Sequence, residues 1–385
     1  MKRFLAIITA AIIIISAAGV EAFAEEDKNF VLNGTTMGVV QDDGSILFKP
    51  QGSSHANSNA LFELLSGNAK RTVVLPKKTF KLDRVLMPGN NKTLIAKGAT
   101  IIQTDLKPIV LNVSTKLKYK SLKNFTINGG TWKTAKKGSG SKKSSTFRFA
   151  HASNIKIKNA TVYTDYFCHA IELIACKNVT VDKCRLIAQG KKNPKDDEVL
   201  QIDIATPTTS PSEAQYGKKF VRGQTCRNIT VKNCYIKGGR GLCTNKNDKI
   251  SSAITSKHHY NIKVLNNTII GETYEALCLH NAAGVTVKGN KITSKSTKPG
   301  HKYGLFLLSM GKCPNLKKQK NLISGNKIKG VEKGVYIHVV DGSPNKFGKT
   351  TFTNNKAYSK AGAKSAISID SVSKLISKGN KKYKW

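Results

Sequence analysis

The sequence predicts an all-β solenoid in which short strands coil into a parallel β-helix, and two alternating motifs carry that prediction. The first motif runs Asn, aliphatic, any residue, aliphatic, two residues, then Asn or Cys, and it occupies 178–184, 228–234 and 261–267. The second is a small residue followed by alternating aliphatic residues. Its copies begin at residues 170, 199, 241, 276, 304, 334 and 366. Repetition at this scale indicates a stack of similar units.

Each strand in these motifs alternates apolar and polar residues, so one face is buried and the other is exposed. A single unit cannot bury its apolar face alone, and stacking the units buries a continuous core. An Asn at the same corner of each unit can join the amides above and below in a ladder. A β-sandwich is less consistent with the pattern, because hairpin signals between neighbouring strands are missing.

The first part of the chain resembles a known fold family. Residues 72–103, TVVLPKKTFKLDRVLMPGNNKTLIAKGATIIQ, and 128–132, NGGTW, resemble the first coils of the pectin-lyase-like superfamily. The resemblance implies one right-handed, single-stranded parallel β-helix domain over 40–375. A short amphipathic helix at 58–66, begun by a capping Ser or Asn, would cap it. Residues 376–385 would form a Lys-rich C-terminal tail.

The N-terminus reads as a targeting segment. Lys2 and Arg3 precede an apolar run that ends at the small-residue site 22–24, so we expect a signal peptide over 1–24 and an N-terminal extension over 25–39. An uncleaved anchor is the alternative, since the run approaches the length of a membrane span. We expect a monomer exported by a bacterium, either free or bound to the cell wall, with no membrane association after cleavage.

The charge is strongly basic, with 64 Lys and Arg against 23 Asp and Glu. Such a surface attracts polyanions. No recognisable nucleic-acid-binding module appears, so acidic polysaccharide is the expected partner and nucleic acid is not. The alternative is a chain that is merely rich in Lys.

In a solenoid of this superfamily, the second motif would form the first strand of each coil, and the Asn or Cys corner would follow the second strand. The outer face of that first strand would bind sugar chains. The candidate catalytic residues on it and nearby are His169, Glu172, Glu198, Asp203, Arg240 and His258. The candidate substrate-binding residues are Gln201, Asn245, His280, Tyr303, Tyr336 and His338.

Three chemistries fit these residues. Hydrolysis needs two carboxyl groups, which Glu172, Glu198 and Asp203 supply. β-Elimination on a uronic acid needs a base and a group that neutralises the carboxylate, such as His169 and Arg240. Pure binding needs only a cleft with aromatic residues. We expect an enzyme that cleaves a uronate-containing polysaccharide, and a non-catalytic polysaccharide-binding or wall-adhesive protein is the alternative.

A metal is possible beside this cluster. Asp196 and Asp197, with Glu198, could hold Ca²⁺, although they could equally form a solvated acidic loop. The long insertions 204–225 and 246–257 would overhang the site. Cysteine pairs at equivalent positions, such as Cys184 with Cys234, favour buried thiol ladders over disulfides, because stacked Cβ atoms point the same way.

Overall fold

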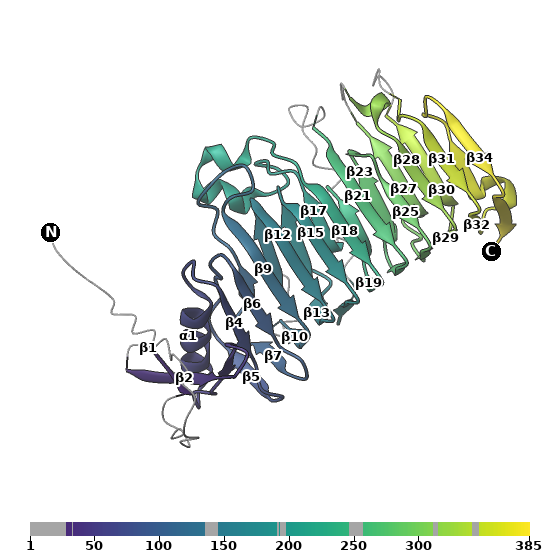
Figure 1. Cartoon of the computed structure of the whole chain (residues 1–385). Coiled ribbons are helices and arrows are strands. Elements are labelled where there is room, and N and C mark those ends of the chain that lie inside the picture. Colours follow the sequence, from purple (N-terminus) through teal and green to yellow (C-terminus); the bar gives the residue numbers. More distant parts are fainter. Residues whose placement is uncertain are drawn as a thin grey trace, which may run out of the picture.

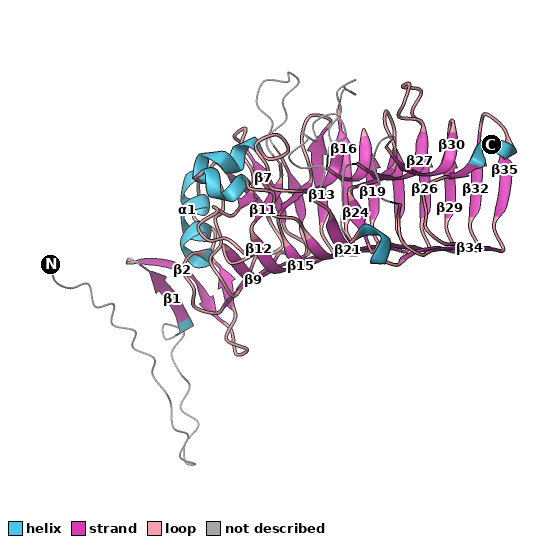
Figure 2. Ribbon diagram, turned by 90° about the horizontal axis from the view of Figure 1, so that it is seen from above, coloured by secondary structure: helices cyan, strands magenta, loops and turns pink. Residues whose placement is uncertain are grey.

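The computed structural model describes residues 28–32, 34–134, 145–190, 192, 198–245, 257–310, 315–340 and 346–385. These residues form a right-handed parallel β-helix, which confirms the predicted fold class. Figures 1 and 2 show the strands stacked side by side from the N-terminal coils to the C-terminal coils. The predicted signal peptide, Asp196 and Asp197 lie outside the described residues.

Three long sheets build the solenoid, and we name them A, B and C. Sheet A contains β1 (Asn29–Leu32), β2 (Thr35–Val40), β3 (Ile46–Phe48), β4 (Arg71–Val74), β6 (Lys92–Ile95), β9 (Leu122–Asn128), β12 (Ala152–Lys158), β15 (Lys177–Asp182), β18 (Arg227–Lys232), β21 (His259–Leu265), β24 (Ala282–Ala283), β25 (Thr286–Lys288), β28 (Asn321–Ser324), β31 (Thr350–Thr353) and β34 (Leu375–Lys378).

Sheets B and C form the other two walls. Sheet B contains β5 (Thr79–Leu82), β7 (Thr100–Gln103), β10 (Thr131–Lys133), β13 (Thr161–Asp165), β16 (Arg185–Gln189), β19 (Tyr235–Gly238), β22 (Thr268–Gly271), β26 (Lys291–Ser294), β29 (Lys327–Gly330), β32 (Lys356–Ser359) and β35 (Lys381–Lys384). Sheet C contains β8 (Val110–Leu111), β11 (Phe147–Ala150), β14 (Ile171–Ile174), β17 (Glu198–Asp203), β20 (Arg240–Thr244), β23 (Leu277–His280), β27 (Tyr303–Ser309), β30 (Lys333–Val339) and β33 (Ile367–Ile369).

The coils stack in register, so equivalent residues form columns. A typical coil runs from β14 in sheet C through β15 in sheet A to β16 in sheet B. Ile171 pairs with Leu200, which in turn pairs with Leu242. These inward residues are fully buried. The second motif is therefore the first strand of each coil, as the resemblance implied.

Two asparagine ladders run along the solenoid, which confirms the expectation of stacked amides. An inner, mostly buried ladder joins Asn267, Asn290, Asn326, Asn355 and Asn380 through amide hydrogen bonds of 2.9 to 3.0 Å. Cys184 and Cys234 occupy the same corner in two earlier coils. The six cysteines of the expected pairs are buried and form no disulfide, as expected for thiol ladders: Cys176, Cys184, Cys226, Cys234, Cys243 and Cys278.

The helix that caps the solenoid begins earlier than predicted. Helix α1 (Ser54–Leu65) is capped by Ser53, whose hydroxyl accepts a hydrogen bond from the Ala56 amide at 3.1 Å. Ser58 is not the N-cap, because it lies in the second turn of the helix, where its hydroxyl donates to the Ser54 carbonyl at 2.7 Å. The short 3₁₀ segments are η2 (Pro211–Tyr216), η3 (Lys218–Val221), η5 (Leu316–Lys318) and η6 (Ala363–Ala366).

Both ends of the solenoid extend beyond the predicted limits. The extension before residue 40 contains β1 and β2, which form an antiparallel pair on sheet A. Residues 376–385, expected to form a tail, instead belong largely to β34 and β35, which pair with β31 and β32. Lys382 aligns with the inward Ala357 but is exposed.

Candidate functional site

Sheet C aligns most of the predicted site residues in columns. The register places Glu172, Gln201, Cys243, Cys278, Phe306 and Tyr336 in one outward column across successive coils. In a second column, Asp203 pairs with Ile174. Farther toward the C-terminal coils, this column contains His280, Leu308 and His338. The sequence periodicity therefore assigned the facing of these residues correctly.

A buried ion cluster lies where three of these strands begin. Arg240 Nη1 lies 2.5 Å from Glu198 Oε1, and Arg240 Nε lies 3.0 Å from Glu275 Oε2. All three side chains are buried. Glu275 also contacts His301 Nδ1 at 2.8 Å, and His169 Nδ1 lies 2.5 Å from the Glu198 carbonyl oxygen. The cluster joins three coils, and both of its carboxyl groups are buried.

Burial and charge oppose one another in this cluster. Burial by itself raises the pKa of Glu275, but the Arg240 charge and the His301 hydrogen bond lower it to about 2. Glu275 is therefore ionised at neutral pH and paired with a cation. The buried ion pairs link the strands of three coils and favour one register, although Glu198 Oε2 is buried without a hydrogen bond.

A second acidic cluster lies beneath the 204–225 insertion. Arg148 on β11 contacts Glu172 at 3.4 Å and Glu213 of η2 at 3.1 Å. Gln201 Nε2 donates to both carboxylate oxygens of Asp203 at 2.9 Å. Burial, reinforced by the charge of Glu172, raises the pKa of Asp203 well above its ordinary value. A raised carboxyl pKa is what a general acid requires.

The insertion lies on the outer face of sheet C and covers part of it. Phe220 packs against His151 with ring centroids 5.3 Å apart, and its carbonyl lies 2.9 Å from His151 Nε2. The Ile204 amide donates to Asn245 Oδ1 at 2.9 Å. Asp203 is consequently buried, and Glu172 keeps only 12% of its side chain exposed. The predicted overhanging segment is a cover held by specific contacts.

Several predicted site residues belong to the interior of this face. Asn245, His258 and His280 are buried. His258 Nε2 lies 2.8 Å from Ser309 Oγ, and Asn245 Nδ2 donates to the His280 carbonyl at 3.1 Å. These residues therefore lie beneath the surface of this face, where neighbouring coils contact them, and their roles in a site remain predictions.

The aromatic residues gather farther along sheet C. The Phe306 and Tyr336 rings stack in parallel at 5.2 Å, and Tyr303 packs against both. His338 stacks on Tyr336 at 5.2 Å and contacts Asp370 at 3.0 Å. Tyr303 is buried, whereas Tyr336 and His338 are half-buried. These residues form a separate group from the carboxylates of the N-terminal coils.

No metal site emerges from the described ranges, in which no three His, Cys, Asp or Glu side chains converge as a set of ligands. Asp196 and Asp197 lie outside those ranges, so Ca²⁺ at that loop remains a prediction.

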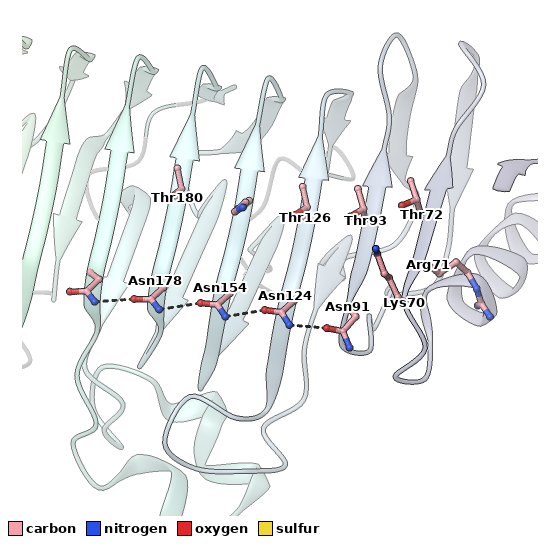
Figure 3. Close-up of a pocket in the computed structure, with 12 residues that line it drawn as sticks. Lys70, Arg71, Thr72, Asn91, Thr93, Asn124, Thr126, Asn154, Asn178 and Thr180 are labelled. Carbon is pink, nitrogen blue, oxygen red and sulfur yellow. Dashed lines mark hydrogen bonds between the residues drawn. The ribbon is translucent and has the colours of Figure 1, made fainter. Parts of the chain in front are cut away.

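An open polar groove crosses the outer face of sheet A, where the sequence did not predict a site (Figure 3). The groove has a volume of about 700 Å³ and crosses six strands, from β4 to β18. Its lining residues are amides, hydroxyls and cations: Lys70, Arg71, Thr72, Asn91, Thr93, Asn124, Thr126, Asn154, Lys156, Asn178, Thr180 and Asn228.

The asparagines of the groove form the outer of the two ladders. Asn124, Asn154, Asn178 and Asn228 each donate an amide hydrogen to the preceding asparagine, at distances of 2.8 to 3.1 Å. Each has φ near +57°, a left-handed conformation that Asn adopts more readily than most residues. Because an amide offers two donors, the ladder leaves one N–H of each exposed amide for a ligand.

The comparisons with known proteins agree on the architecture. No protein-family model matches the sequence. The plasmin and fibronectin-binding protein A of Streptococcus pneumoniae is 27% identical over 200 residues, which are 48% of this chain and 26% of that protein. A structure of PfbA, a surface adhesin of S. pneumoniae, matches with a TM-score of 0.56 at 16% identity, over 85% of this chain and 87% of that chain. At this identity the match shows a shared right-handed parallel β-helix fold.

A second PfbA structure agrees, with a TM-score of 0.57 and 19% identity over 84% of this chain and 80% of that one. At these identities the likeness shows a common β-helix and leaves the function to the residues of this chain. The chain spans about a quarter of the length of the curated relative. In the part that the structure describes, no helix combines the length and apolarity needed to cross a bilayer.

The groove could have been anticipated from one signal in the sequence. The first Asn of each motif copy recurs at 154, 178 and 228, and the residue two positions later is Lys156, Thr180 or Thr230. Alternation places Asn and that residue on the same outward face. These positions served only to define the repeat, and the continuous surface that they line was therefore missed.

Proposed function

We propose that this chain is a non-catalytic, surface-located or exported bacterial protein that binds a polysaccharide along the groove of sheet A. The observation that carries the proposal is the contrast between two faces. On sheet C, Glu198 and Asp203 are buried and Glu172 is nearly so, and Glu172 and Glu198 are in ion pairs, whereas the groove is open and lined by polar side chains.

The groove suits a repeating polymer. Its lining repeats with each coil, about every 4.8 Å along the solenoid axis. Asparagine amides and threonine hydroxyls offer donors and acceptors to sugar hydroxyls, and Lys70, Arg71 and Lys156 add positive charge for acidic groups. An acidic polysaccharide lying along the axis would meet equivalent partners on each coil.

The similarity to PfbA supports the binding class, since that protein is described as a surface adhesin and as a plasmin- and fibronectin-binding protein. The non-catalytic alternative from the sequence is therefore favoured over the enzyme. We retain the other expectations as proposals: export, a monomeric state, and a partner that is neither nucleic acid nor membrane.

A polysaccharide hydrolase or lyase is the second candidate, and the raised pKa of Asp203 favours it. Asp203 could donate a proton to a leaving sugar while Glu172 acts as the second carboxyl. That activity would require the 204–225 insertion to move aside, because Asp203 is buried beneath it.

The test removes polar groups from the groove without altering the strands. In the variant T126V/K156V/T180V, three neighbouring outward residues lose their hydrogen-bonding groups. The matched control K263V/T286V/T351V changes the same residue types in the same column of sheet A, beyond the groove. Binding of oligogalacturonates and neutral oligosaccharides would be measured by calorimetry.

Three lost hydrogen bonds are expected to weaken binding at least about tenfold. The control is expected to bind within about twofold of the wild type. Equal affinities for the groove variant and the wild type would refute the groove as the binding site.

A further inference from the structure

Four lysines form a column on the outer face of sheet B at the C-terminal end of the solenoid. Lys291 of β26 pairs with Lys327 of β29, Lys327 pairs with Lys356 of β32, and Lys356 pairs with Lys381 of β35. All four are exposed. Adjacent strands lie about 4.8 Å apart, so four positive charges follow one another at that spacing. We call this column the lysine ladder.

At the N-terminal end of sheet B, the column that contains the lysine ladder consists of threonines. Its first four members are Thr79, Thr100, Thr131 and Thr161, which pair in register on consecutive strands. Threonine pairs stabilise neighbouring strands, whereas like charges directly opposite one another destabilise them. The replacement of threonine by lysine therefore opposes folding, and packing within the chain does not explain it.

The chain supplies little negative charge to the ladder. Residues 286–385 contain 22 Lys, no Arg and three acidic residues. Among the described residues of this region, the ion pairs join Lys333 to Glu332, His338 to Asp370 and His301 to Glu275, and none involves a ladder lysine. An external anion would remove the repulsion between neighbouring ammonium groups.

Aromatic rings beside the ladder restrict the basic side chains. Tyr358 and Tyr383 occupy the next outward column and stack at 4.8 Å. Lys327 Nζ lies 5.6 Å from the Tyr358 ring, and Lys329 Nζ lies 5.0 Å from the Trp385 ring. Such cation–π contacts hold ammonium groups near a surface without neutralising them. Of the ladder lysines, Lys327 makes such a contact, and Lys329 makes one next to the ladder.

We propose that the lysine ladder docks a linear polyanion whose charged groups are phosphates, with the polymer running along the solenoid axis. We take phosphate as the charged group because lysine, the one basic residue type that this region uses besides histidine, binds phosphate as a compact point charge. The ladder lies on a different sheet from the groove of sheet A and at the opposite end of the solenoid. The inference therefore goes beyond the proposed function.

The test replaces the ladder with the residue that the chain itself uses elsewhere in that column. The variant K291T/K327T/K356T/K381T is compared with the control K77T/K78T/K81T/K97T, which removes the same charge from exposed lysines at the N-terminal end. The probe is inorganic polyphosphate, measured over a series of salt concentrations, with polygalacturonate as the carboxylate arm.

The ladder variant is expected to bind polyphosphate at least about 100-fold more weakly at low salt, while the control stays within about threefold of the wild type. Four lost contacts should reduce the slope of log affinity against log salt by about 3. The variant should melt at the same or a higher temperature than the wild type, because like-charge pairs have been removed.

Equal losses in the ladder variant and the control would overturn the proposal and assign the binding to net charge. Polygalacturonate that binds the wild type as tightly as polyphosphate, and loses as much affinity in the ladder variant, would overturn the phosphate preference. Oligosaccharide affinity of the sheet A groove is measured in the same variants. If the ladder variant lost oligosaccharide affinity while its polyphosphate affinity stayed unchanged, the two surfaces would not be separate. If the groove variant kept its oligosaccharide affinity, the groove proposal would fail, but the polyphosphate result would still test the ladder.

Discussion

Replacing Arg240 by methionine tests the structural role of the buried ion cluster. The substitution keeps a long side chain but leaves Glu198 and Glu275 buried beside each other without their cation. Removing one partner of a buried ion pair costs about 3–5 kcal/mol of unfolding free energy. The lowering of the Glu275 pKa from 4.5 to about 2 corresponds to about 3 kcal/mol, which agrees with that range.

The cost should depend on pH with a definite sign. In the wild type, the depressed pKa of Glu275 gives a stability that is present above pH 4.5 and is lost as the pH falls towards 2. Without Arg240, burial raises the pKa of the same carboxyl, so protonation relieves the buried charge. The difference between variant and wild type should therefore shrink between pH 7 and pH 4.

Urea unfolding at pH 7 and pH 4 measures the difference in global unfolding free energy between the variant and the wild type. Hydrogen exchange of β17, β20 and β23 measures the local difference in stability, because coils of a solenoid can unfold independently. Arg222→Met is the matched control, since Arg222 is exposed, and it should change the stability by less than about 0.5 kcal/mol. A cost below about 1 kcal/mol for Arg240→Met at pH 7, or an equal cost at both pH values, would refute this reasoning.

Three further predictions concern the ladders and the cover. Asn154→Ala should lower the unfolding free energy by about 1–2 kcal/mol in urea titrations, because alanine is strained at φ +57°. Asn154→Gly should lower it less, and equal losses for the two variants would contradict the strain argument. Phe220→Ala should accelerate hydrogen exchange across 205–223 by at least about 100-fold, since it removes a buried ring from the contact with His151; unchanged exchange would show that the cover does not depend on this contact. Native protein should protect Cys176 and Cys226 from a thiol reagent that labels them in urea, because burial raises the pKa of both thiols; a disulfide in the mass spectrum of the untreated protein would contradict the free-thiol ladder.

The fold could be predicted because its determinants are local and repeated. Alternating aliphatic residues assign inward and outward faces, and a motif of constant phase fixes the register of one coil on the next. The same periodicity places Glu172 beside Gln201, and the two residues do pair in register. The C-terminal limit was misplaced because Lys382 stands where the coil before has alanine, so the apolar alternation that marks a strand is missing there.

The site was less predictable, because it depends on contacts between segments without periodicity. The 204–225 insertion has no repeat that fixes its position. Its residue Glu213 forms an ion pair with Arg148, and the insertion buries part of the outer face of sheet C. The burial of Asn245 and His280 follows from such contacts and from neighbouring coils. The sequence pattern places Glu198, Arg240 and Glu275 at the start of consecutive strands, but their ion pairs became evident only when the side-chain directions were known.

The mass of an oligosaccharide recovered after prolonged incubation with the protein tests the binding function most directly. Oligogalacturonate of defined length would be incubated with the protein, with and without Ca²⁺, then released by salt and weighed by mass spectrometry. A binding protein returns every oligosaccharide at its original mass, and that is the predicted result. Shortened products would contradict it: saturated fragments would identify a hydrolase, and fragments one water lighter would identify a lyase acting by β-elimination.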